Sequence, residues 1–232
     1  MSDTFDFERY WLTKFGDCLE AVGGPAVRQQ VLQGSQVLSD DTPRAAVISW
    51  TQEAVQRMGS VLDEEQQKQV MTGCACRYPK ENLQDMRRTY AETGDIRLVH
   101  QMLLDQFASF LRNTLELSEE MTAEILDLGW GAAGVLQADR IIATKIPKSG
   151  NLTAYLEETD REQRRRDYCH CPRVRAALET EETIPPIYCY CGAGFYRGIW
   201  EEILGQPVRV EVLETVLGGG DVCRIAVHLP VG

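Results

Sequence analysis

Three cysteine pairs, each with one residue between its two members, restrict most strongly how this chain can fold. They stand in the segments GCACRYP at 73–79, DYCHCPRVR at 167–175 and IYCYCGAGFYRG at 187–198. If the pairs share one site, the chain must bring together positions that lie far apart in the sequence. Loop closure costs only roughly (3/2)RT ln n, so this separation is no obstacle. We therefore expect the pairs to converge, with sulfurs from at least two of them within about 4 Å, the edge of a tetrahedral thiolate site.

Metal binding is the first interpretation of these thiols. The second and third pairs, Cys169/Cys171 and Cys189/Cys191, are separated by seventeen residues with a predicted helix. That length lets two pairs fold onto one tetrahedral ion. Cys74 and Cys76 would replace one pair or extend the site. Zinc is the expected ion, and an iron–sulfur cluster, which also takes four thiolates, is the alternative.

Two other interpretations of the cysteines remain open. They can be buried small hydrophobic residues, or a pair can act as a redox or nucleophilic dithiol that needs no cofactor. Basic residues recur beside the pairs, and arginine lowers the pKa of a nearby thiol. Cys18 and Cys223 have no thiol neighbour in sequence and are expected to be packing residues, although the turn before Cys223 leaves open that it reaches the site.

A ligand pocket is predicted beside the third pair. The segment CGAGFYRGIWEEILG combines a glycine-rich turn with a helix start near Gly194, whose dipole would stabilise thiolate charge. Phe195, Tyr196 and Trp200 are the expected apolar lining, and Arg173 and Arg197 are expected to bind an anionic group. The alternative for the aromatic residues is core packing. The alternative for the arginines is separate surface ion pairs.

The charge balance excludes some partners. Thirty-five acidic against twenty-four basic residues give a net charge of −11, which repels nucleic acid. The N-terminal MSDTFDFERYW lacks the features of a signal peptide, and no apolar run approaches the roughly 20 residues of a membrane span. We therefore expect a cytoplasmic protein with no membrane span, in which thiols stay reduced.

Hydrophobic periodicity divides the chain into a helical region, 1–128, and an α+β region, 129–232, which can share one core. Period-3.6 patterns predict helices over 6–22, 43–62, 63–73, 80–94, 95–117 and 118–129. Beyond 129, a strand is expected at 140–147, a polar helix over 151–168 and a short helix at 171–178. Alternation in 208–217 and 222–229 around Gly218–Gly219–Gly220 predicts a final antiparallel β-hairpin.

The last fifty residues resemble the C-terminal half of the vinyl-reductase-type small-molecule-binding domain. The resemblance is carried by the glycine-led helix to ILG at 203–205, the strand VRVEV, and GDVCRI at 220–225, where Ile225 replaces the usual aromatic residue. With CHCPRVR upstream, the chain is also similar to uncharacterised prokaryotic proteins sometimes labelled L-2-amino-thiazoline-4-carboxylic acid hydrolases. Residues 1–128 fall largely outside the resemblance.

The resemblance implies an α+β fold, a small hydrophobic ligand, cysteine-bound metal and a homodimer. Together with the thiols, it favours a cytoplasmic metal-binding protein that also binds a small molecule. A thiol-dependent enzyme, redox or hydrolytic, is the second hypothesis, and a structural helical adaptor is the third. No catalytic motif matches residue by residue, so the sequence leaves open whether the protein is an enzyme.

Overall fold

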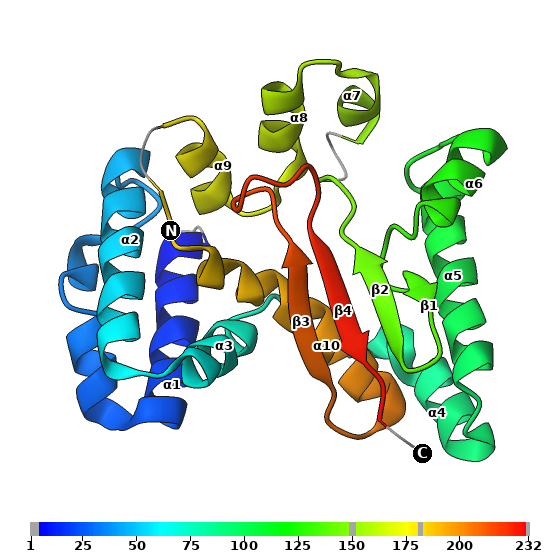
Figure 1. The fold of residues 1–232 in the computed structure, drawn as a ribbon, viewed down its shortest axis with the longest axis horizontal. Coiled ribbons are helices and arrows are strands. Elements are labelled where there is room, and N and C mark those ends of the chain that lie inside the picture. The colour runs from blue at the N-terminus through cyan, green and yellow to red at the C-terminus, as the bar shows by residue number, and fades with distance from the viewer. Residues whose placement is uncertain (1–4, 149–151, 181–182, 231–232) are drawn as a thin grey trace.

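The computed structural model describes residues 5–148, 152–180 and 183–230 (Figure 1). The helices before residue 129 are α1 (Phe7–Val31), α2 (Arg44–Val61), α3 (Glu64–Gly73), α4 (Gln84–Thr93), α5 (Ile96–Asn113) and α6 (Glu119–Asp127), with 3-10 turns η1 (Ser35–Val37) and η2 (Lys80–Leu83). The later elements are β1 (Val135–Leu136), β2 (Arg140–Thr144), α7 (Leu152–Glu157), α8 (Arg161–Tyr168), α9 (Pro172–Leu178), η4 (Pro186–Cys189), α10 (Tyr190–Leu204), β3 (Arg209–Glu214) and β4 (Arg224–His228). The predicted α+β class is confirmed.

The helix ends follow the local sequence signals. Asp63 and Gln66 form a reciprocal capping box at the start of α3, which ends at the predicted Gly73. Ser118 caps α6 through the Met121 backbone N–H, as its position before the apolar run predicts. Gly94, at a φ of 64°, closes α4 in the left-handed conformation that glycine tolerates best.

Two helices differ from expectation. The first was predicted to stop at Gly23–Gly24–Pro25, yet it breaks only at Gly24, at a φ of 84°, and resumes to Val31. The polar helix predicted over 151–168 is two helices, because the Glu158 carboxylate accepts from the Thr159 and Asp160 backbone N–H groups and Asp160 caps α8. Residue 151 of that prediction lies outside the described residues.

The described strands form one antiparallel sheet in the order β1-β2-β4-β3. The predicted strand at 140–147 is β2, and the predicted final hairpin is β3 paired with β4, in register at Val212 and Ile225. In Figure 1 the helix α10 lies behind this sheet. It packs on β3 and β4 and also contacts α3 and α4.

Helix α10 is the central element, because helices from the first half of the chain contact it as closely as the sheet does. Gly194 makes this packing close: a Cβ atom there would lie 2.1 Å from the Thr72 carbonyl oxygen of α3. Trp200 and Ile199 of the same helix are fully buried. Buried side chains of residues 1–128 and 129–232 form one continuous hydrophobic cluster.

Candidate functional site: a cluster of cysteines

Each cysteine pair stands where one structural element gives way to another. Cys74 is the C-cap of α3, with Cys76 just beyond it. Cys169 is the C-cap residue of α8, and Cys171 is the N-cap residue of α9. Both have an extended backbone conformation. Cys189 ends η4, and Cys191 lies in the first turn of α10, which begins at Tyr190 rather than near Gly194 as predicted. The third pair therefore forms part of the helix start itself.

The three pairs interact electrostatically with one another, and the expected distance of about 4 Å between sulfurs of different pairs stays a prediction. The Cys191 thiol interacts electrostatically with Cys171 and Cys76, and Cys74 interacts with Cys191. The Cys189 thiol interacts with Cys169 and Cys171 of the second pair. Tyr188 contributes to the same region, since its hydroxyl lies 3.6 Å from the Cys171 Sγ atom.

The two single cysteines pack in or against the hydrophobic core, as expected, and each also interacts with members of the pairs. Cys18 interacts with Cys74, whose own thiol donates to the Val70 carbonyl at 3.2 Å, and a Cβ atom at Gly73 would lie 2.7 Å from the Cys18 Sγ atom. Cys223 interacts with Cys169 and Cys189. All eight cysteines of the sequence thus form one electrostatically connected network, called here the thiol cluster.

Most thiols in the cluster are held in the protonated form. Burial, followed by the neighbouring Cys171, raises the pKa of Cys169 to about 12 and that of Cys191 to about 12. Burial also raises the pKa of Cys223, and raises that of Cys189 well above its ordinary value. A thiolate in an apolar, thiol-rich surrounding is destabilised unless a cation neutralises it.

Two lysines supply positive charge to the thiol cluster. The Lys14 ammonium donates to the Ala75 carbonyl and lowers the pKa of Cys18. Lys145 follows β2, and its backbone N–H donates to the Cys223 carbonyl at 2.8 Å. Burial lowers the pKa of Lys145, but the surrounding cysteines, Cys169 first, outweigh it and raise the pKa. Within the described ranges, no carboxylate forms an ion pair with Lys145, and the acidic groups that act on it most strongly are thiols.

The side chains are not arranged around one point. Across the described residues, no group of three or more His, Cys, Asp or Glu side chains is positioned to hold a metal ion. The predicted zinc or iron–sulfur ligation by Cys169, Cys171, Cys189, Cys191, Cys74 and Cys76 therefore stays a prediction. Binding would require the cysteine side chains to turn about χ1.

The residues expected to bind a ligand make mainly structural contacts. Arg173 is fully buried, pairs with the fully buried Glu8 and lies 3.8 Å from the centre of the Trp11 ring. Arg197 donates to the Thr72 hydroxyl at 2.9 Å. Tyr196 and Trp200 are buried in the core, and Phe195 packs edge-on against Tyr78 at 6.0 Å.

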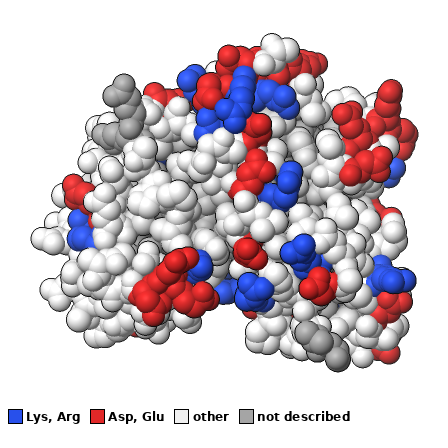
Figure 2. All heavy atoms as spheres, in the orientation of Figure 1, with Lys and Arg blue, Asp and Glu red and all other residues white. Residues whose placement is uncertain are grey.

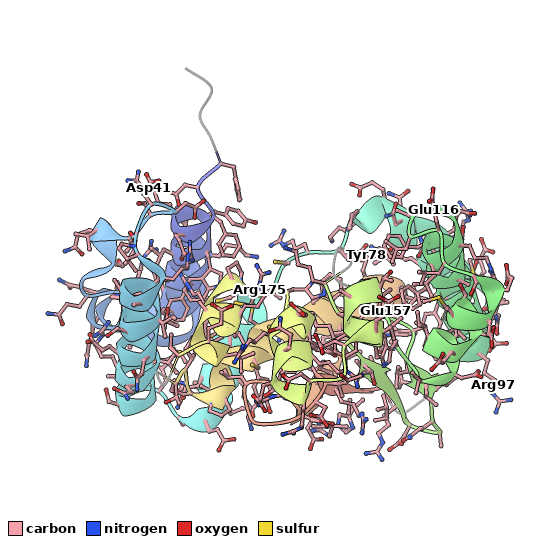
Figure 3. All side chains as sticks on the ribbon, turned by 90° about the horizontal axis from the view of Figure 1, so that it is seen from above. Asp41, Tyr78, Arg97, Glu116, Glu157 and Arg175 are labelled. Carbon is pink, nitrogen blue, oxygen red and sulfur yellow. The ribbon has the colours of Figure 1, made fainter. Side chains whose placement is uncertain are left out.

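Figure 3 shows Tyr78 on the segment that leaves α3 and passes between the blue N-terminal helices and the green helices. Arg175 of α9 lies on one side of it and Glu116 on the other. This segment carries the exposed Cys76, so the first pair borders solvent, whereas Cys74 is buried. Sequence reasoning did not identify Lys14, Lys145 or the role of Cys18. The spacing of Lys14 and Cys18, four residues apart on a helix, was the available signal for one of them.

No family model, curated protein or solved structure matches this chain. The likeness to the vinyl-reductase-type domain therefore stays a prediction. The described helices include none that is long and apolar enough to cross a membrane.

Proposed function

We propose that this protein binds a thiophilic metal ion, zinc, through Cys169, Cys171, Cys189 and Cys191. The observation that supports the proposal is that electrostatic interactions link all eight cysteines, from both halves of the chain, into the thiol cluster. Packing alone does not require cysteine at so many junctions between elements, whereas soft thiolate ligands are what zinc selects.

The charges around the cluster suit a metal thiolate. Four thiolates around one divalent ion leave about two negative charges, and Lys14 and Lys145 lie beside the cluster to offset them. The raised pKa values of Cys169 and Cys191 mean that metal binding must release protons from these thiols. Affinity should therefore fall as the pH is lowered.

Cobalt(II) replaces zinc and reports its ligands in the absorption spectrum. We expect one reduced chain to take up about one cobalt ion with intense thiolate-to-metal charge-transfer bands and the visible bands of a tetrahedral site. Cys169→Ser and Cys189→Ser should each weaken the bands strongly. Cys223→Ser, which alters a cluster cysteine outside the four ligands, is the matched control and should keep them. A spectrum without charge-transfer bands, or one unchanged in Cys189→Ser, contradicts the proposal.

A second candidate function is thiol–disulfide exchange by Cys18 and Cys74. Cys18 is partly exposed and Cys74 is buried, at 2% exposure, on neighbouring helices that pack together. Interaction with Cys74 lowers the pKa of Cys18 to about 7, and the same interaction, followed by burial, raises that of Cys74, whose thiol donates to the Val70 carbonyl. A reactive outer thiol beside a protonated inner one is the arrangement that a dithiol exchange site requires.

In this exchange one reduced Cys18/Cys74 pair reacts with one molecule of a small disulfide, such as glutathione disulfide. The Cys18 thiolate attacks one sulfur of the substrate, forms a mixed disulfide and displaces the first glutathione thiolate. The Cys74 thiol then loses its proton to solvent and attacks the Cys18 sulfur, which displaces the second thiolate. The substrate is reduced to two thiols, and Cys18 and Cys74 are oxidised to a disulfide.

Alkylation of the reduced, metal-free chain tests this second function. Cys18 should react with iodoacetamide faster than the buried cysteines, with a rate that reaches half its maximum near pH 7, because the thiolate is the reactive form. Lys14→Gln should move this midpoint upward, since the Lys14 cation stabilises the Cys18 thiolate. Peptide mass spectrometry after timed labelling gives the rates. Uniformly slow labelling of all eight positions would exclude the exchange site.

A further inference from the structure

A cavity of about 490 Å³ lies beside the thiol cluster, between α7–α8 and the adjoining ends of β2 and β4. Thr144 at the end of β2 and Arg224 at the start of β4 pair in the sheet and both line it. The volume falls within the roughly 300–1,000 Å³ of small-molecule sites. It is called here the arginine pocket.

One wall of the arginine pocket is aromatic. Trp130 and Tyr155 both line it, and their ring centres are 5.8 Å apart. Leu128 and Val222 add aliphatic surface to the lining. Such a wall buries the apolar body of a ligand and favours flat rings, which pack well against aromatic side chains.

The rest of the lining is rich in arginine. Figure 2 shows basic side chains gathered at the top of the molecule, over α8, with acidic side chains beside them. Arg161 and Arg165 of this group are already engaged: Arg161 pairs with Asp221 at 2.6 Å, and Arg165 pairs with Glu162 at 2.8 Å and donates to the Val216 carbonyl. These two arginines fasten the β3–β4 connection to α8.

Arg164 contacts the Tyr155 side chain instead. Its guanidinium carbon lies 4.7 Å from the centre of the Tyr155 ring, and its buried Nε atom has no hydrogen-bond partner. Within the described parts of the chain, no carboxylate pairs with Arg164. Arg224 is only weakly engaged, with Glu214 at 3.9 Å. Two guanidinium groups in the lining therefore have donors available to an incoming anion.

We propose that the arginine pocket binds a small organic anion with an aromatic body, such as an aromatic carboxylate. Arg164 and Arg224 would bind the carboxylate, since guanidinium groups match its geometry, and Trp130 and Tyr155 would contact the ring. The inference is independent of metal binding. The two sites adjoin, because Lys145 and the cluster member Cys223 directly follow the lining residues Thr144 and Val222.

Calorimetry with 2-naphthoate and its neutral counterpart 2-naphthamide tests the proposal on the full chain. We expect 2-naphthoate to bind and the amide to bind at least tenfold more weakly, because only the carboxylate gains charge-assisted hydrogen bonds. Arg164→Gln and Arg224→Gln should each lower the binding affinity for 2-naphthoate about tenfold or more.

The control variant is Arg166→Gln, which removes an arginine of the same helix that does not line the pocket. It should bind 2-naphthoate like the unaltered chain, and thermal unfolding verifies that each variant is folded. Absence of 2-naphthoate binding, equal binding of the amide, or equal losses in Arg164→Gln and Arg166→Gln would each overturn the proposal.

Discussion

Replacing Glu8 by glutamine is expected to lower the free energy of unfolding by about 3–5 kcal/mol, the cost of removing one partner from a buried ion pair. Glu8 and Arg173 are both fully buried, and the second Glu8 oxygen accepts from Arg44 at 2.6 Å. Without the carboxylate, the Arg173 cation stays inside the protein with no counter-charge among these contacts. Urea unfolding followed by tryptophan fluorescence measures the loss.

The loss should extend to the thiol cluster, because Arg173 belongs to α9 and Cys171 caps the start of that helix. Alkylation of Cys171 should therefore accelerate in Glu8→Gln. The matched control is Glu53→Gln, which removes an exposed ion pair with Arg57 four residues away. Exposed pairs contribute less than about 1 kcal/mol. Equal effects of the two substitutions would show that the buried pair does not hold α1 and α9 together.

Replacing Gly194 by alanine is expected to destabilise the fold by about 3 kcal/mol, the upper part of the range for overpacked interiors. The new Cβ atom would lie 2.1 Å from the Thr72 carbonyl oxygen and 2.8 Å from the Ala75 Cβ atom. A backbone oxygen cannot turn away as a side chain can, so α3 and α10 must separate. The separation of the two helices would also displace Cys74, which lies between Thr72 and Ala75 in the sequence.

Gly198 on the same helix provides the comparison. It is exposed, and nothing lies within 4 Å of the position of an added Cβ atom. Gly198→Ala should therefore stabilise the chain by roughly 0.5–1 kcal/mol through the better helix propensity of alanine. Thermal and urea unfolding of both variants give the two values. A neutral Gly194→Ala would mean that α3 and α10 do not pack as closely as described.

Local signals predicted the elements well because they act within a few residues. The acidic start and Gly73 end of the 63–73 helix, the cap at Ser118 and the alternation around Gly218 each placed an element correctly. Local signals misplaced the end of the first helix, since glycine and proline permit a kink as readily as a stop. They also missed the division of the 151–168 helix, which depends on the carboxylate of Glu158.

Long-range partners were harder to predict. Close approach of the three pairs stays a prediction, and the interaction of Cys18 with Cys74 depends on how α1 packs on α3, which no spacing reveals. Arg173 was expected to bind an anionic ligand, and its anion is Glu8, 165 positions away. Helical periodicity identifies a buried face without identifying the residue that meets it.

Metal content tests the central claim most directly. The full chain, expressed in medium with zinc and purified without added metal or chelator, is analysed for zinc and iron, and its free thiols are titrated in parallel. Zinc binding at Cys169, Cys171, Cys189 and Cys191 predicts about one zinc per chain, with about four thiols protected until a chelator is added. Less than about a tenth of an equivalent of either metal, with all eight thiols freely titratable once the chain is unfolded without chelator, would contradict it.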